Sequence, residues 1–126
     1  MKNIKKIALT LVLVMALAVV GCGAKTVESF YTKASNKVQI DKQIESTLDQ
    51  LNGVLSDLKI NFSENDIIYE MYFSKDEYIA AVKPAYDENQ LNAIKSEIQT
   101  ECGIEPTSVT IKFFGSDGAE KDSVSK

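Results

Sequence analysis

The chain of 126 residues contains no histidine, no arginine and no tryptophan. Histidine is the most common general base and a frequent zinc ligand, and arginine binds phosphates and carboxylates with two parallel hydrogen bonds. Their absence excludes histidine-dependent catalysis, histidine-ligated zinc and arginine-based anion recognition. Any catalytic chemistry is left to carboxylates, lysines, hydroxyls and two cysteines.

Positive charge is outnumbered by negative charge in this sequence, with 14 basic against 18 acidic residues. Every basic residue is a lysine, and the formal net charge is −4 at pH 7. Proteins that bind nucleic acids neutralise phosphates with clustered cations. Because this acidic chain has no such cluster, we expect no nucleic-acid partner.

No apolar run is long enough to cross a membrane. A transmembrane helix needs roughly 20 apolar residues, whereas the run near the start covers residues 7–20 and is interrupted by Thr10. Three lysines precede this run, and Gly21 and Cys22 follow it. A basic start, an apolar core of about 7–15 residues and a small residue before the cleavage site are typical of a secretory signal. We therefore predict a signal peptide over residues 1–21.

The cysteine that closes this segment predicts a lipid anchor. The sequence Val19-Val20-Gly21-Cys22 resembles the lipobox of bacterial lipoproteins, in which the cysteine thiol receives a diacylglyceryl group before cleavage in front of it. Each buried methylene contributes about 0.8 kcal/mol, so two acyl chains such as palmitate give stable anchoring. We expect lipid attachment at Cys22 and a location on the outer face of the cell membrane. An uncleaved anchor, or a secretory signal with a coincidental cysteine, is the alternative.

The mature chain is predicted to hold one folded domain. Removal of the first 21 residues leaves 105 residues and takes three lysines away, so the net charge falls from −4 to −7. This length suits one hydrophobic core. Residues 22–34 are predicted to form a polar, lipidated tether, in which Phe30 and Tyr31 pack onto the domain. Residues 35–126 are predicted to form the domain, and its acidity leaves membrane attachment to the lipid.

Hydrophobic periodicity predicts the secondary structure of this domain. Apolar residues recur at spacings of three and four from Ile40 to Leu58 and then alternate with polar residues. The predicted helices span residues 36–57 and 87–102, and the predicted strands span 58–62, 67–73, 108–114 and 119–124. The order α-β-β-α-β-β indicates an α+β two-layer sandwich. We expect a mostly antiparallel sheet with two helices on one face and the charged last strand at an edge.

Start and stop signals define the second of these helices. Asp87 and Gln90 have the spacing of a capping box, and Gly103 is the residue type that ends helices in a left-handed conformation. A short helix through residue 82, with Ser74 as its cap, is predicted before it.

The remaining thiol, Cys102, falls on the apolar stripe of the same predicted helix. Buried cysteine packs as a small hydrophobic residue, which is the role we predict. Redox activity or dimerisation through a disulfide is the alternative. The neighbouring Glu101 and Glu105 oppose formation of a reactive thiolate.

Two pairs of adjacent carboxylates were candidates for acid–base catalysis, Asp76-Glu77 and Asp87-Glu88. Each pair lies at a predicted helix start, where negative charge complements the helix dipole. The acidic segment 117–122 lacks the ligand spacing of a calcium loop and predicts a turn. We therefore predict no catalytic residue, no cofactor and no metal site, and hence a non-enzymatic binding domain. An envelope-associated enzyme or accessory subunit that uses a carboxylate or a lysine is the alternative.

Strand alternation places a second group of residues on the sheet face away from the helices. These include Ile68, Tyr72 and Phe114. Exposed aromatic residues in one patch often mark contact sites, so these three form a candidate partner surface for a protein or an envelope ligand. The alternative is a half-solvated face with a Glu70–Lys112 cross-strand pair.

The sequence as a whole resembles a family of small, uncharacterised lipoproteins from low-GC Gram-positive anaerobes, classed as a domain of unknown function. The resemblance covers nearly the whole mature chain and implies an extracytoplasmic, lipid-anchored α+β domain without known catalytic residues. Besides the lipobox, the segments that carry it are Val27-Glu28-Ser29-Phe30-Tyr31, Ile67-Ile68-Tyr69-Glu70-Met71-Tyr72-Phe73, Thr100-Glu101-Cys102-Gly103-Ile104 and Asp117-Gly118.

Overall fold

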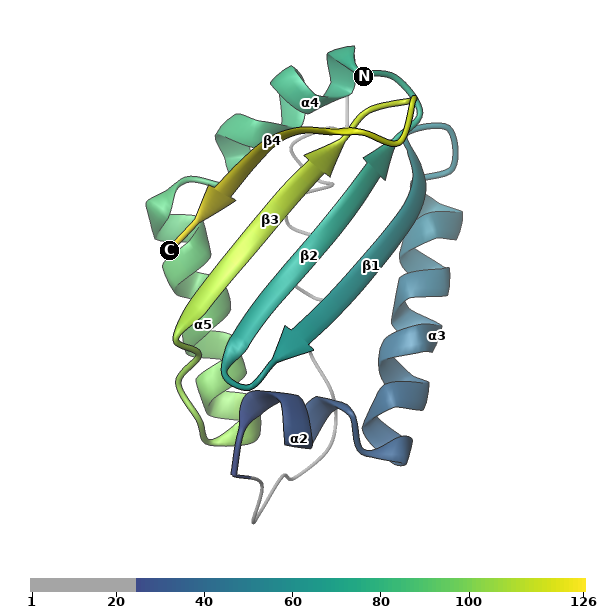
Figure 1. Cartoon of the computed structure of the whole chain (residues 1–126). Helices are drawn as coiled ribbons and strands as arrows, with labels where there is room; N and C mark the ends of the chain where they lie inside the picture. Colours follow the sequence, from purple (N-terminus) through teal and green to yellow (C-terminus); the bar gives the residue numbers. More distant parts are fainter. Residues whose placement is uncertain (1–24) are drawn as a thin grey trace.

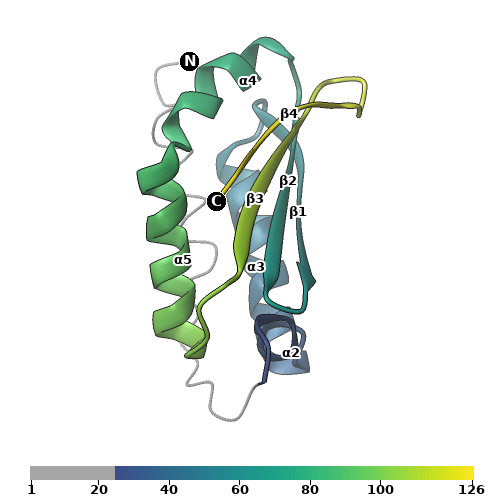
Figure 2. The same cartoon turned by 60° about the vertical axis from the view of Figure 1, so that its left-hand side comes forward.

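A computed structural model describes residues 25–126, in which a four-stranded sheet carries its long helices on one side (Figures 1 and 2). This arrangement confirms the predicted α+β class. The elements in chain order are α2 (Val27–Tyr31), α3 (Ala34–Gln50), β1 (Leu55–Ser63), β2 (Asp66–Phe73), α4 (Glu77–Val82), the 3-10 helix η1 (Lys83–Ala85), α5 (Glu88–Cys102), β3 (Ser108–Phe114) and β4 (Glu120–Ser125).

The sheet is mixed, because its central pair of strands is parallel. The strand order is β1-β2-β3-β4, and the predicted hairpins β1–β2 and β3–β4 are antiparallel. Strands β2 and β3 run parallel, with Tyr72 opposite Phe114. Parallel neighbours need a crossover connection, and α5 supplies it by returning the chain to the other end of the sheet. The expectation of a mostly antiparallel sheet therefore holds for the two outer pairs and is wrong for the central one.

The first long helix ends earlier than its periodicity predicted. Helix α3 stops at Gln50, Gly53 adopts a φ of 91° in the following turn, and Leu55 already belongs to β1. Leu55 and Leu58 are three residues apart and both buried. A bulge between Leu55 and Asp57 shifts the strand register and turns both side chains inward. The three-residue spacing of these buried leucines, which is typical of a helix, therefore arises here from a bulge in a strand.

Order begins earlier in the chain than expected. Residues 27–31, predicted as part of the tether, form helix α2, and Thr26 caps it by accepting a hydrogen bond from the Ser29 N–H. The packing predicted for Phe30 and Tyr31 is confirmed, since their exposed fractions are 0% and 1%. The tether assigned to residues 22–34 is therefore too long at its C-terminal end.

Helix α5 follows its sequence signals closely. The Asp87 carboxylate accepts a 2.9 Å hydrogen bond from the Gln90 N–H, and Gly103 ends the helix with a φ of 79°. The inward stripe of this helix is buried as predicted, and it consists of Leu91, Ile94, Ile98 and Cys102.

The short helix before α5 is present, but its predicted cap is wrong. Asp76, not Ser74, occupies the N-cap position of α4. The Ser74 hydroxyl instead donates a 2.6 Å hydrogen bond to the Gly53 carbonyl, which joins the end of β2 to the turn after α3. Strand β4 at the far edge is largely exposed, as expected for a charged edge strand.

Candidate functional site

Cys22, the predicted lipid attachment site, lies outside the described residues, so lipidation stays a prediction. Within residues 25–126, no helix is long and apolar enough to cross a membrane. The remaining site residues predicted from the sequence, Ile68, Tyr72 and Phe114, lie in the sheet.

These three residues share the sheet face away from the helices. Their side chains are half-buried, whereas their neighbours Tyr69 and Phe113 point to the helix side and are buried. We call the surface formed by Ile68, Tyr72 and Phe114 the open face. Figure 2 shows the two long helices on the opposite side of the sheet from it.

An aromatic stack is the main feature of the open face. The rings of Tyr72 and Phe114 lie 4.4 Å apart between centroids with an interplanar angle of 18°. The parallel register of β2 and β3 brings them together. The Lys59 ammonium lies 5.2 Å from the centre of the Tyr72 ring, within cation–π range. The strands therefore present a rigid aromatic pair with a cation beside it.

The charged residues around the stack pair differently from the alternative interpretation, which expects a Glu70–Lys112 pair. Glu70 and Lys112 are opposite each other in the register, as expected. The Lys112 ammonium, however, lies 3.7 Å from Glu120 of β4, and the Glu70 carboxylate accepts a 3.4 Å hydrogen bond from the Tyr72 hydroxyl. Lys112 pairs with Glu120 because the edge strand β4 places this second carboxylate close to the Lys112 ammonium.

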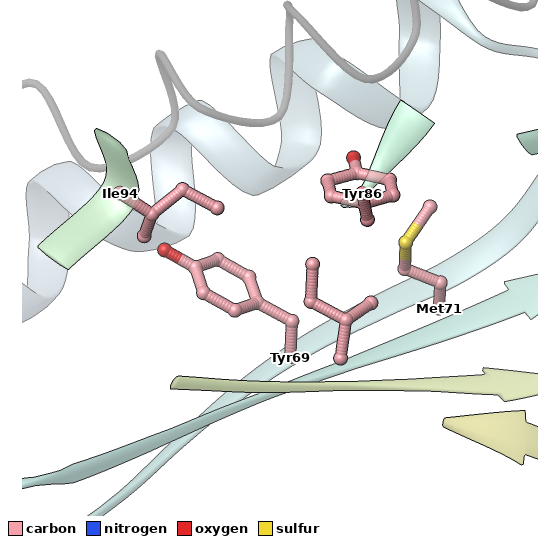
Figure 3. Close-up of a pocket in the computed structure, with 5 residues that line it drawn as sticks. Tyr69, Met71, Tyr86 and Ile94 are labelled. Carbon is pink, nitrogen blue, oxygen red and sulfur yellow. The ribbon is translucent and has the colours of Figure 1, made fainter. Parts of the chain in front are cut away.

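A small cavity in the core adds no ligand site. It is about 10 Å³ in volume, about enough for one water molecule, and its lining includes Tyr69, Met71, Tyr86 and Ile94 (Figure 3). The Tyr69 and Tyr86 hydroxyls are buried without a hydrogen-bond partner among residues 25–126, and they point in different directions. Burial raises the pKa of both tyrosines above the usual value. Both hydroxyls therefore stay neutral, and the cavity is too small for a ligand.

Cys102 is buried, which confirms its predicted packing role. Its thiol donates a 3.4 Å hydrogen bond to the Ile104 carbonyl. Burial raises the pKa of the Cys102 thiol. A raised pKa disfavours the thiolate that nucleophilic and redox chemistry require.

Two of the four carboxylates considered for catalysis, Asp76 and Asp87, accept hydrogen bonds that connect parts of the fold. Asp87 caps α5, and Asp76 accepts a 2.8 Å hydrogen bond from the Ser116 N–H, so it ties α4 to the β3–β4 turn. In that turn Asp117 accepts from the Ala119 N–H, which lowers the Asp117 pKa. Among the described residues, no group of three or more histidine, cysteine or carboxylate side chains is arranged to hold a metal ion.

A cleft between α3 and β1 was missed by the sequence reasoning. Its volume is about 270 Å³. Its α3 wall includes Lys37, Ile40 and Asp41, and its β1 wall runs from Ile60 to Phe62. Tyr31 closes one part of it by stacking on Phe62, with ring centroids 5.1 Å apart. No local pattern reveals this cleft, because it depends on how far α3 sits from the edge of the sheet.

Comparisons with protein-family models, with curated proteins and with solved structures found no match for this chain. The family resemblance carried by its sequence motifs therefore stays a prediction.

Proposed function

We propose that the chain is a lipid-anchored, non-enzymatic binding domain on the outer face of the cell membrane, which contacts a partner protein through the open face. The observation that carries this proposal is the Tyr72–Phe114 stack, half-buried on the sheet face opposite the helices. Protein contact surfaces typically place aromatic anchors at the centre and polar groups around them.

The polar surroundings of the stack favour a protein as the partner. Lys59 lies on one side of it, while Lys112 and Glu120 form an ion pair on the other. Charges of both signs around an apolar centre match another protein surface better than a polyanionic polymer.

The start of the fold limits the distance between the domain and the proposed lipid. The core begins at Val27, only a few residues after Cys22. The five Cα–Cα steps from Cys22 to Val27 can span roughly 18 Å at most. The backbone of α2 also contacts the β1–β2 turn, since the Glu28 N–H donates to the Glu64 carbonyl at 2.8 Å. A lipid on Cys22 would therefore hold this end of the sheet close to the membrane surface.

Site-specific photo-crosslinking in intact cells tests the proposal. A photoreactive residue replaces Thr110, which lies opposite Ile68 beside the open face, and a matched control replaces Val38, which is 52% exposed on α3. We expect a discrete crosslinked protein from position 110 and none from position 38. The product should be lost when Tyr72→Ser and Phe114→Ser are added. An equally strong product in that double variant, with the fold intact by circular dichroism, would rule out the open face as the contact surface.

A further inference from the structure

The two edges of the sheet are protected to different degrees. Edge strands expose unpaired N–H and C=O groups that can pair with another chain, and charged side chains are one device against this. Strand β4 carries three consecutive charges, Glu120, Lys121 and Asp122. Strand β1 has no charge from Ile60 to Ser63. Strand β1 also carries Asp57 and Lys59, so it is its second half, from Ile60 to Ser63, that lacks the protection that charge gives.

The cleft between α3 and β1 reaches this edge. Ile60, Asn61 and Phe62 all line it. Because β1 is an edge strand, these three consecutive residues place the cleft along the outer side of the sheet. Helix α3 runs alongside β1 and forms the other wall (Figure 1).

The α3 wall offers both charged and apolar groups. Lys37, Ile40, Asp41 and Ile44 line the cleft and share one helix face by their spacing. Lys37 and Asp41 are exposed, and neither makes an ion pair with another described residue. The cleft thus presents one cation and one anion above two isoleucines.

We propose that this cleft binds an extended peptide segment of a partner protein, which adds to β1 as a fifth strand. The outward-facing backbone groups of the edge strand β1 would supply the main-chain hydrogen bonds, as in other complexes formed by strand addition. Side chains two positions apart on a strand lie about 6.6–7 Å from each other. Lys37 and Asp41 are neighbours about 5–6 Å apart on the helix surface.

Because alternate side chains of the peptide would have nearly the same spacing as Lys37 and Asp41, the charges of two peptide residues can be predicted. An acidic residue would face Lys37, and a basic residue two positions away would face Asp41. Their aliphatic stems would lie on Ile40 and Ile44. No residue of the open face lines the cleft, although Asn61 lies opposite Ile68 in the strand register. The proposed peptide site is therefore tested separately from the proposed function.

Fluorescence polarisation with blocked hexapeptides tests the proposal on the full chain in detergent. The probes have the form fluorescein-Thr-X-Val-Z-Val-Thr-amide, with glutamate or lysine at X and Z in all four combinations. The direction in which the peptide runs along β1 decides whether position X or position Z faces Lys37. We therefore expect one of the two mixed-charge probes to bind about threefold to tenfold tighter than the like-charged probes. Lys37→Glu combined with Asp41→Lys should transfer this preference to the opposite order. Lys42→Glu, outside the cleft lining on the same helix, is the matched control and should change nothing.

Backbone N-methylation of the preferred probe distinguishes strand addition from other modes of peptide binding. Methylation of one alternate set of nitrogens should abolish binding, and methylation of the other set should leave it unchanged, because only every second N–H faces the partner strand. Equal binding of both methylated probes would overturn the proposal. So would the absence of binding by all four probes at 1 mM, or an unchanged charge preference in the swapped variant. Binding should persist in the Tyr72→Ser, Phe114→Ser double variant.

Discussion

The rings of Tyr72 and Phe114 stack at a centroid distance of 4.4 Å across the parallel strands β2 and β3, on the face away from the helices. The α5 crossover brings β3 beside β2 in parallel, and the register of this pair places the two residues opposite each other. The same contact can stabilise the sheet and present a surface to a partner, and the two roles are measurable separately.

The stabilising role predicts a coupling between the two rings. A double-mutant cycle with Tyr72→Leu and Phe114→Leu should give an interaction free energy of about 0.5–1.5 kcal/mol, since stacked aromatic pairs contribute this much beyond their buried area. Urea unfolding of the four proteins measures it. Additive effects of the two substitutions would show that the stack contributes nothing beyond separate burial.

The core face of α5 should dominate the stability of the domain. Ile98 has an exposed fraction of 0%. Ile98→Ala should lower the free energy of unfolding by about 2–5 kcal/mol, because it removes buried methylenes and leaves a cavity. Val38→Ala, at a side chain that is 52% exposed, is the control and should change it by less than about 0.5 kcal/mol. Similar losses in the two variants would contradict the described packing of α5.

Removal of the Asp87 cap of α5 should lower the free energy of unfolding by less than the Ile98 substitution does. Asp87→Ala should lower the free energy of unfolding by about 1 kcal/mol, because the Gln90 N–H loses its acceptor. Asp87→Asn should retain most of the stability, since the amide oxygen can accept the same hydrogen bond. If the asparagine and alanine variants were equally unstable, the effect would belong to the charge and not to the cap.

Local sequence signals were sufficient for α5 and for the strands that follow alternation. Asp87 and Gly103 bound the helix by backbone chemistry that needs no tertiary contact. The period of two in 108–114 likewise fixed which side chains of β3 are buried. The end of α3 could not be found in this way, because a bulge gave Leu55 and Leu58 a helical spacing inside a strand.

The candidate sites were predictable only in part, for a similar reason. Alternation placed Tyr72 and Phe114 on one face, but their stacking depends on which strands become neighbours. The salt bridge of Lys112 with Glu120 depends on the position of β4 at the edge. The cleft between α3 and β1 is a product of helix placement, which no run of residues encodes locally.

Glu97 predicts an unusual dependence of stability on pH. Burial raises the pKa of its carboxyl group, so the folded state binds this proton more tightly than the unfolded state. Above this raised pKa, Glu97 is ionised in the folded state, and its burial lowers the free energy of unfolding. This loss of stability disappears as the pH falls toward the usual pKa of glutamate. Glu97→Gln should stabilise the domain at pH 7, and the gain should vanish toward pH 4. Urea unfolding across this range measures the effect.

Asp122 provides the matched control of opposite sign. Its hydrogen bond from the Lys83 ammonium, at 2.6 Å, lowers the pKa of the Asp122 carboxyl. A lowered pKa gives stability that is present above the unfolded-state pKa and is lost as the pH falls through the folded-state pKa. Asp122→Asn should therefore destabilise at pH 7 and have less effect in acid. A gain at neutral pH in both variants would contradict this account of the two carboxyl groups.

The proposed lipidation of Cys22 is tested most directly by metabolic labelling with a clickable palmitate, followed by fractionation of the cells. The wild-type chain should carry the label and sediment with the membrane fraction, and Cys22→Ala should carry none. A Cys22→Ala chain labelled as strongly as the wild type, or an unlabelled wild-type chain in the cytosol, would contradict the proposed anchoring.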